Sequence, residues 1–502
     1  MRAILILIAA APLCAGVPQG HEPEDLSERI DKAFEGLEPA DDHTFFRRIH
    51  LDLVGRLPHA DEIREFAKKP DRKAAVDRLL ESPEAARYWA DRWLRLLITW
   101  DFRETDPFVV DFQALHGWFE KTWNEKWGYD KFFTAIVAAE GEKYDKPETN
   151  YLVRYADPKT PPVEVASRVS RIFLGTQIQC AQCHDHPYEK WTQKDFWGMA
   201  AFFGGLRSKT RQTFDGMKTK LAQNEPVETK VTTIMEEDWK ATPKFLDGRA
   251  PATGQKARAE FAKFALSMDD RRFAKAFVNR EWARLMGRPL VEPVDNFHES
   301  TPLLDALAED FEKNGYDLRR LLRAILNSKA YQSKTGPARK LKPQGPIEFL
   351  NNFEYALEIH VFFEQLYKQF RENKDLPEQY RQPVVFRVYL TQFVSALLTP
   401  GGKAPEDAEY TGSVRLALRL MNSKDLQGLM SAQWGHLKRT LESIQEPADR
   451  IEEIFLTLVS RPPDDEERQR YLRYIAKKKG DSKAYEDVYW VLINSPDFYF
   501  NY

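Results

Sequence analysis

The sequence predicts a mainly α-helical protein: two helical domains with repeated helix–turn–helix units, joined by a short β-containing linker. Three observations support this. Apolar residues recur every three or four positions over most of the chain, which is the period of a helix. Turns that contain Gly, Arg and Pro interrupt this helical period at regular places. The segment Leu206–Gly254 lacks the helical period. With 502 residues the chain is long enough for two hydrophobic cores. The expected parts are a signal peptide (1–16), an N-terminal domain (17–205), the linker (206–255) and a C-terminal domain (256–502).

Helical patterns are clear in the first third of the chain. Charged and apolar faces alternate in Ala74–Leu80 and again in Tyr88–Ile98. Asp130 is expected to cap a helix over Lys131–Ala139, because aspartate is a favoured residue just before a helix. Each segment is therefore expected to pack one face against a core.

The middle of the N-terminal domain contains a predicted helix–loop–helix junction. Val163–Leu174 is expected to be a helix that ends at Gly175, since glycine is favoured just beyond a helix end. Thr192 is expected to cap the next helix, with Asp195 as its capping-box partner. The residues between these two helices should form a loop.

The linker differs in composition from its flanks. It is filled by Lys, Thr, Gln, Pro and Gly, and only Val227–Met235 has the β-branched content of a strand. The helical pattern resumes near Lys256. One short β element is therefore expected between the domains.

A pattern recurs three times along the chain, with a partial middle copy. Each copy is expected to contain a helix, a turn with an arginine, further helices, and a serine at which the last of these helices ends. We expect each arginine to anchor its turn through carbonyls or a carboxylate, because a guanidinium suits fixed multidentate contacts. The turns and their later serines are Gly55–Pro58 with Ser82, Gly287–Pro289 with Ser328, and Ser460–Pro463 with Ser495.

Residues 180–184 have the CxxCH spacing at which haem c is attached to proteins. Two intervening residues let one helical turn present the thiols of Cys180 and Cys183 to one porphyrin edge, where each adds to a vinyl group. His184 would then bind the haem iron as an axial ligand. The third cysteine of the chain, Cys14, falls in the predicted signal peptide.

Other interpretations of the motif remain open. The thiols could form a disulfide or a redox-active pair. A zinc or iron site could use Cys180, Cys183, His184 and His186. His186 could equally orient the metal ligands through a hydrogen bond, act as a general base, or form a hydrogen bond that orders the loop. Two cysteines are too few for an all-cysteine iron–sulfur cluster.

A haem would have a sixth coordination position, for which Met199 and His298 are candidates. An open position would instead favour small-ligand or peroxide chemistry over electron transfer. The usual hydrolase, nucleotide and calcium signatures are absent from the sequence, so those classes lack support.

Composition limits the partners and the location. The chain has 74 basic and 77 acidic residues, a net charge of −3 and no dense basic tract, so nucleic acid is not expected as a partner. Met1–Gly16 has the basic start, apolar run and small residues of a signal peptide, which predicts a periplasmic or secreted protein. We expect no transmembrane segment, since no apolar run is long enough.

Taken in order, these motifs resemble the planctomycete-type secreted proteins that carry domain of unknown function 1549 followed by domain of unknown function 1553. The first domain is matched over Asp41–Phe203, including Phe46–Leu53 and Gln179–Pro187. The second shows in Val291–Phe297 and Leu420–Asn422. The resemblance implies an exported protein, and many members look like haem proteins, but it implies little mechanism.

Members often carry a separate cytochrome-c-like domain, which this sequence is not expected to contain, so any haem role would depend on residues 180–184 alone. Two departures from the family pattern matter. The stretch after Phe297 is shorter than usual, and Ile347–Arg381 matches poorly. No functional role is carried over to either region.

The predicted function is that of an exported protein that binds one c-type haem through Cys180, Cys183 and His184. Its role would be electron transfer or partner-coupled redox chemistry. The expected partner is a redox protein or one related to extracellular polysaccharide. Two alternatives remain: a zinc- or iron-dependent enzyme that uses the Cys/His cluster, and a non-catalytic binding scaffold with a CxxC disulfide.

Overall fold

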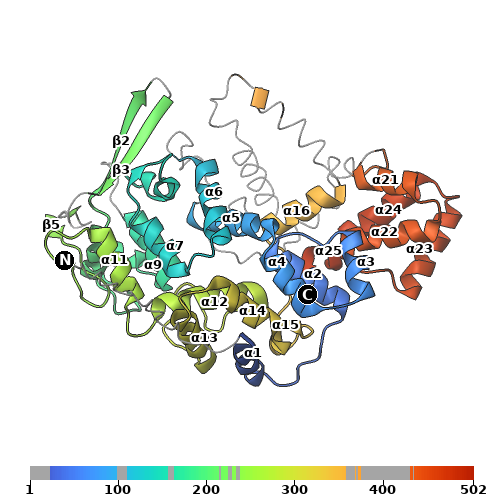
Figure 1. Cartoon of the computed structure of the whole chain (residues 1–502), viewed down its shortest axis with the longest axis horizontal. Coiled ribbons are helices and arrows are strands. Elements are labelled where there is room, and N and C mark those ends of the chain that lie inside the picture. Colours follow the sequence, from blue (N-terminus) through green and yellow to red (C-terminus); the bar gives the residue numbers. More distant parts are fainter. Residues whose placement is uncertain are drawn as a thin grey trace, which may run out of the picture.

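A computed structural model describes residues 23–98, 110–156, 163–213, 216–223, 229–232, 238–357, 430–433 and 435–502, with isolated positions between 357 and 430. The protein is mainly α-helical, as the sequence predicts (Figure 1). The predicted signal peptide (1–16), Cys14 and the Leu420–Asn422 motif lie outside the described residues. Within the described part, no helix has the length and apolar character needed to cross a membrane.

Three copies of one helical unit account for much of the chain and confirm the predicted repeat. Each copy has a long helix, a turn, two further helices and a last helix introduced by the serine of the pattern. The first copy is α2 (Asp42–Leu53), α3 (Ala60–Lys68), α4 (Arg72–Leu80) and α5 (Pro83–Leu97). The middle copy is α12 (Arg272–Met286), α13 (Pro302–Lys313), α14 (Leu318–Asn327) and α15 (Lys329–Gln332). The last copy is α22 (Pro447–Val459), α23 (Asp465–Lys477), α24 (Ser482–Ile493) and α25 (Pro496–Tyr499).

The turn of each copy has the same backbone geometry. The residue before the arginine lies in the left-handed region, with φ of 69° at Gly55, 75° at Gly287 and 60° at Ser460. Such a residue ends a helix because it redirects the chain and satisfies the last carbonyls. The serines that follow are N-caps, and two of them, Ser82 and Ser328, accept a hydrogen bond from a backbone amide of the next helix.

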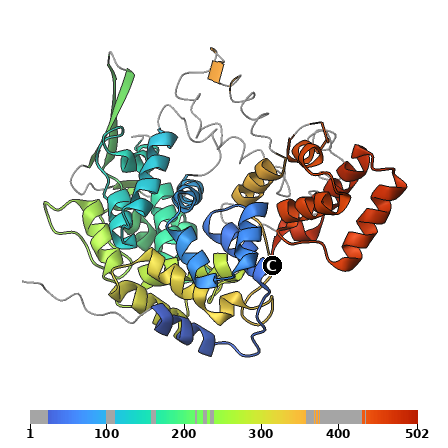
Figure 2. The same ribbon diagram turned by 45° about the vertical axis from the view of Figure 1, so that its right-hand side comes forward.

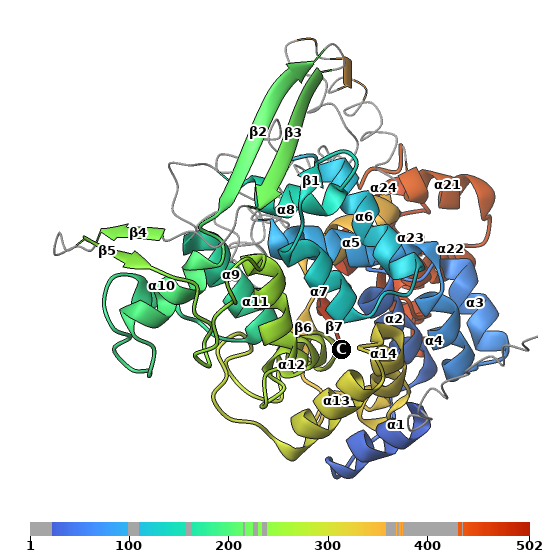
Figure 3. The ribbon, with the colours of Figure 1, turned by 60° about the vertical axis from the view of Figure 1, so that its left-hand side comes forward.

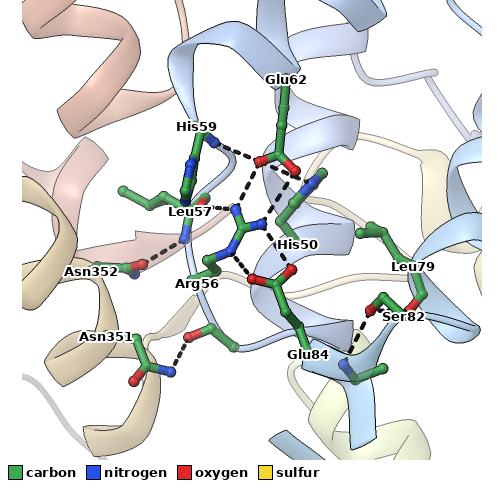
Figure 4. A network of polar contacts seen from close by, with 12 residues as sticks. His50, Arg56, Leu57, His59, Glu62, Leu79, Ser82, Glu84, Asn351 and Asn352 are labelled. Carbon is green, nitrogen blue, oxygen red and sulfur yellow. Dashed lines mark hydrogen bonds and ion pairs between the residues drawn. The ribbon is translucent and has the colours of Figure 1, made fainter. Parts of the chain in front are cut away.

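Arg56 anchors the first turn, as predicted (Figure 4). Its guanidinium donates to the Leu57 carbonyl at 2.9 Å. It also forms paired hydrogen bonds with the Glu62 carboxylate, at 2.8 and 3.2 Å, and with the Glu84 carboxylate, at 2.9 Å each. All the N–H groups of this guanidinium are bound by the Leu57 carbonyl of the turn and by the carboxylates of Glu62 on α3 and Glu84 on α5, so its role is structural.

Arg461 repeats this arrangement in the last copy. It donates to the Pro462 carbonyl at 3.3 Å and to the Glu467 carboxylate at 2.7 and 2.9 Å. A second carboxylate, Asp497, accepts at 2.8 Å. Arg288 of the middle copy differs, because its recorded partner is the carbonyl of Pro337.

The remaining helices surround these units. They are α1 (Pro23–Lys32), α6 (Phe112–Asn124), α7 (Tyr129–Val137), η1 (Pro147–Thr149), α8 (Asn150–Val153), α9 (Val163–Leu174), η2 (Gln179–Gln182), α10 (Gln193–Ala201), α11 (Ala257–Leu266), α16 (Pro346–Leu357) and α21 (Gly435–Ser443). The prediction that Asp130 caps a helix was wrong, since α7 begins at Tyr129 with Gly128 as its N-cap. A tertiary contact sets this start: the Tyr129 amide donates to the Tyr316 carbonyl at 3.1 Å.

The strands are few and antiparallel. β2 (Leu206–Thr213) and β3 (Gly216–Gln223) form a hairpin, and β1 (Gly141–Glu142) adds to the free edge of β3. β4 (Thr229–Thr232) pairs with β5 (Asp238–Ala241), and β6 (Lys342–Pro343) pairs with β7 (Phe500–Asn501). β4 lies within the predicted strand segment Val227–Met235. The longer β2–β3 hairpin was not predicted, because lysine, arginine and threonine give its strands little apolar signal.

The main hydrophobic core spans both sides of the predicted linker. It contains Trp93 and Phe173 from the first part and Phe273 from α12, with Tyr129 stacked on Phe273 at a centroid distance of 4.9 Å. A second core joins α16 and the C-terminal helices, and it includes Leu51 of α2. Those C-terminal helices, in red, stand to one side of the molecule (Figure 2). The domain boundaries remain a prediction.

Two buried arginines of α2 bind the C-terminal tail. Arg47, 1% exposed, donates to the carbonyls of Asp497 at 2.5 Å and Phe500 at 3.2 Å. Arg48 is fully buried and donates to the carbonyl of Tyr502 at 3.1 Å. Since a buried guanidinium needs several acceptors, the last residues of the chain must return to α2.

Asp52, on the same helix, is the buried anion of this region. It accepts hydrogen bonds from the Tyr331 hydroxyl at 2.7 Å, Lys342 Nζ at 2.6 Å and Asn501 Nδ2 at 2.9 Å. Burial raises the pKa of Asp52, but the cations Lys342 and Arg339 outweigh burial and hold the pKa below its ordinary value. Asp52 therefore joins the first copy, the middle copy and the C-terminus.

Replacing Asp52 by alanine should destabilise the fold strongly. Lys342 would lose its carboxylate partner in a largely buried site, and breaking a buried pair typically costs about 3–5 kcal/mol. Urea denaturation followed by circular dichroism measures the change. Asp61, whose side chain is 97% exposed, provides the control, and Asp61→Ala should change the free energy of unfolding by less than about 0.5 kcal/mol. Equal losses in the two variants would contradict the role of Asp52.

Candidate functional site

The CxxCH motif lies in the loop between α9 and α10, at the predicted helix–loop–helix junction (Figure 3). Helix α9 ends at Leu174, and Gly175 follows in the left-handed region with φ of 53°. A Cβ at Gly175 would lie 2.2 Å from the Phe297 ring, so only glycine fits this turn. The chain then enters η2, which contains Cys180.

The η2 turn places the two cysteines on one side. A 3₁₀ helix has three residues per turn, so residues i and i+3 lie over each other. Ile178 and Ala181 are fully buried and point toward the main core. Cys180 and Cys183, also three apart, are exposed on the outside. Both are free thiols that no disulfide joins. The loop therefore presents both sulfurs to solvent together.

Side chains of α10 hold the motif from behind. Gln193 Nε2 donates to the carbonyls of Gln182 at 3.2 Å and Cys183 at 3.1 Å. Trp197 Nε1 donates to the same Gln182 carbonyl at 3.1 Å. In return, Asp185 Oδ1 accepts from the Gln193 amide at 2.8 Å. Sequence reasoning missed these supporting residues, for which the only signal was their closeness to the motif.

The predicted capping box at the start of α10 is confirmed. The Asp195 amide donates to Thr192 Oγ1 at 3.2 Å, and the Thr192 amide donates to Asp195 Oδ2 at 2.9 Å. The box fixes the first turn of α10, and Gln193 lies in that turn. The capping residues therefore position Gln193, whose side chain binds the backbone carbonyls of the cysteine motif.

His184 is exposed and held in one tautomer. Its Nδ1 lies 2.7 Å from the Asp185 carbonyl oxygen. A carbonyl can only accept, so Nδ1 carries the proton and Nε2 keeps its lone pair. A histidine that binds a metal through one ring nitrogen usually donates a hydrogen bond from the other, often to a backbone carbonyl, and this bond fixes the orientation of the ring. Among the described residues Nε2 has no hydrogen-bond partner, so it is free to bind a metal.

His186 has a different role in the same loop. Its backbone amide donates to the Trp191 carbonyl at 2.8 Å, and its Nδ1 accepts from the Tyr188 amide at 3.3 Å. The ring proton then sits on Nε2, so neither nitrogen offers a free lone pair. These contacts match the loop-ordering interpretation. In the part of the chain that the structure describes, no group of three or more His, Cys, Asp or Glu side chains could hold a metal ion.

The two candidates for a sixth ligand are placed differently. Met199 on α10 is fully buried in the main core. The His298 side chain is 52% exposed, and its Nε2 lies 2.9 Å from the carboxylate of Glu189, a residue of the motif loop. Asn296 Nδ2 binds the same carboxylate at 2.8 Å. His298 is therefore linked to the loop, whereas Met199 is turned away from solvent.

A second cluster of titratable groups surrounds the first turn (Figure 4). His50 is fully buried, its Nδ1 lies 2.8 Å from the Phe46 carbonyl, and its Nε2 lies 3.8 Å from the Glu62 carboxylate. Burial lowers the pKa of His50. Because Glu62 is bound by Arg56 and by the His59 amide, at 2.8 Å each, this cluster serves the turn. The motif loop remains the candidate functional site.

Comparison with known proteins identifies two matching families. Residues 27–208 match the family model PSCyt2, described as a protein of unknown function (DUF1549). Residues 257–350 match the model PSD1, also described as a protein of unknown function (DUF1553). The order is the one that the motifs predict. No curated protein and no solved structure matches the chain.

Replacing Gln193 by alanine should loosen the motif loop. The variant loses both side-chain hydrogen bonds to the carbonyls of Gln182 and Cys183. Each bond contributes about 1 kcal/mol, so amide hydrogen exchange in the motif should accelerate at least about fivefold. Exchange mass spectrometry of the peptide that covers residues 179–187 measures this. Lys194→Ala, at the exposed neighbouring position, should leave the exchange rate unchanged; equal acceleration would refute the support role.

Proposed function

We propose that this chain, which belongs to the proteins that carry a DUF1549 domain followed by a DUF1553 domain, binds one haem covalently. Cys180 and Cys183 would form the two thioether bonds, and His184 would bind the iron. The expected location is the periplasm or the extracellular space, since haem is attached to CxxCH outside the bacterial cytoplasm. The role would be electron transfer, or redox chemistry coupled to a partner.

The observation that carries the proposal is the shared outward face of the two thiols. Ile178 and Ala181 bury the inner side of η2, and both cysteines are exposed on the outer side as free thiols. The two sulfurs can therefore meet two vinyl groups on one porphyrin edge without a rearrangement of the core. In each addition the sulfur bonds to one carbon of a vinyl group, and the thiol proton adds to the other carbon of the same double bond.

His184 supports the same proposal independently. The Asp185 carbonyl holds the proton on Nδ1, which leaves Nε2 with a free lone pair one residue after Cys183. A bound haem supplies a one-electron couple at iron, whose potential depends on the axial ligands and on burial. The residues of the chain hold and orient the groups that would bind the haem. Side chains of α10 fix the loop, and the Asp185 carbonyl fixes the imidazole of His184. An exposed loop favours exchange of electrons with a partner.

The two alternatives rest on less. A zinc or iron enzyme would need His186 as the fourth ligand, yet His186 Nδ1 accepts from the Tyr188 amide. A scaffold with a CxxC disulfide would give no role to His184, whose Nε2 has no hydrogen-bond partner among the described residues. Metal analysis and a thiol count of the same sample distinguish both from a haem protein.

Substitution of both cysteines should abolish haem attachment. The full chain and its Cys180→Ala/Cys183→Ala variant are produced in a host that matures cytochromes c. The wild type should show a Soret band and a pyridine haemochrome spectrum that survives acid–acetone extraction. The double variant should retain no covalent haem, because no other described cysteine exists to replace the two thiols.

Two single variants of the loop sharpen the test. His184→Ala should keep the covalent bond but shift the Soret band, because the axial ligand is lost. His186→Ala is the matched control and should leave the spectrum unchanged, whereas a metal site of four ligands would lose its ion. Covalent haem in the double variant, or one zinc per wild-type chain without a Soret band, would refute the proposal.

A further inference from the structure

One side chain of the region that matches DUF1553 (residues 257–350) joins both flanks of the motif loop, which belongs to the region that matches DUF1549 (residues 27–208). Asn296 Oδ1 accepts a hydrogen bond from the Gln177 amide at 2.9 Å, ahead of the cysteines. Its Nδ2 donates to Glu189 Oε1 at 2.8 Å, beyond the cysteines. A backbone amide can only donate and a carboxylate accepts, so these partners fix the orientation of the Asn296 side chain.

The residue after Asn296 is paired with the start of the same loop. The Phe297 amide donates to the Gly175 carbonyl at 3.2 Å. Arg272, at the start of α12, links the two segments, because its Nη1 donates to Thr176 Oγ1 at 3.0 Å and to the Phe297 carbonyl at 3.2 Å. The start of the loop is therefore bound to the DUF1553 region by backbone and side-chain contacts.

The segment that contains Asn296 is itself held by α12. Asn279, in the middle of that helix, is fully buried. Its Oδ1 accepts from the amides of Leu290 at 2.8 Å and Val291 at 3.1 Å, and its Nδ2 donates to the Val291 carbonyl at 2.7 Å. Because Arg272 holds the far end of the segment, α12 fixes it at both ends. Asn296 therefore reaches the loop from a support with its own hydrogen bonds.

Glu189 is the contact point on the loop side. Its side chain is only 14% exposed, and the oxygen that accepts from Asn296 also lies 2.9 Å from His298 Nε2. One carboxylate oxygen can accept two hydrogen bonds, so both contacts are compatible. Burying a carboxylate without partners is costly. These contacts therefore favour the position of the loop in which Glu189 meets the DUF1553 region.

We propose that Asn296 is a positioning residue of the haem site, so that the DUF1553 region completes a site whose haem-binding residues belong to the DUF1549 region. This role rests on the haem attachment proposed above. A haem bound through two sulfurs and one imidazole needs all three held in one arrangement, and a loop needs supporting contacts to hold them. Side chains of α10 hold the middle of the loop, and Asn296 holds its flanks.

The association of the two regions does not depend on Asn296, which is only half-buried. The main core already joins them through aromatic pairs. The ring centroids of Phe273 and Phe133 lie 4.8 Å apart, and those of Phe277 and Tyr129 lie 4.1 Å apart. Buried aromatic side chains contribute most of the packing energy of such a contact. Loss of the Asn296 side chain should therefore loosen the loop without separating the two regions.

Three variants of the full chain separate the hydrogen bonds from charge. Asn296→Ala removes both hydrogen bonds without a change in net charge. Glu189→Gln removes the negative charge, but the new amide oxygen can still accept from Asn296 and His298. Asn124→Ala makes the control substitution at the exposed end of α6. If Asn296→Ala does not fold, Glu189→Ala, which removes only the contacts beyond the cysteines, is measured in its place.

Spectra of the holoprotein test the role at the haem. The variants are produced in a host that matures cytochromes c, and the electron paramagnetic resonance spectrum and the reduction potential of the haem are measured. Asn296→Ala should shift both the g values and the potential, because the His184 imidazole is no longer held in one orientation. Glu189→Gln and Asn124→Ala should keep the wild-type g values. Wild-type values in Asn296→Ala, or an equal shift of the g values in Glu189→Gln, would overturn the proposal.

Hydrogen exchange in protein made without haem distinguishes this role from haem attachment. Exchange in the peptide of residues 179–187 should be at least about fivefold faster in Asn296→Ala than in the wild type, and unchanged in Asn124→Ala. Equal rates in Asn296→Ala and the wild type would overturn the positioning role even where haem is attached. Faster exchange in a chain that never carries haem would keep Asn296 as the support of the loop and refute the haem function alone.

Discussion

The buried charges of α2 constrain the rest of the molecule. Asp52 is nearly inaccessible and must be neutralised, and its partners come from two parts of the sequence far from α2: Tyr331 and Lys342 from one, and Asn501 from the other. Arg47 makes a similar demand through the carbonyls of the last residues. Because a buried ion without partners costs several kcal/mol, the first copy, the middle copy and the C-terminal tail can fold only together. The hydrophobic packing of the C-terminal helices on α2 then follows from this arrangement.

That rigid assembly is what makes a surface loop usable as a site. Helices α9 and α10 are packed in the main core, so the loop between them has fixed ends. Gln193 and Trp197 hold its carbonyls, and Ile178 holds its inner side. Only the outer side, with its two thiols and one imidazole, is left without a structural use. Reactive groups on a loop that a rigid scaffold positions are a common basis of function in proteins.

Local features could be predicted from the sequence. The end of α9 at Gly175, the capping box of Thr192 and the anchoring role of Arg56 depend on residues close in the chain. Tertiary features could not: the acceptors of Arg47 lie about 450 residues away, and the start of α7 is set by a contact with Tyr316. The hairpin escaped prediction because its strands alternate cations with small polar residues, a pattern that carries little apolar signal. The burial of Met199 likewise depends on packing that no local pattern encodes.

Tandem mass spectrometry of the peptide that contains residues 180–184 tests the central claim most directly. The protein is taken from cells that attach haem c and is digested without reduction. If the loop is built for covalent attachment, the peptide will carry one haem bridged between Cys180 and Cys183. A peptide with two unmodified thiols, or with a disulfide between them, would contradict that function and leave the loop as a structural feature.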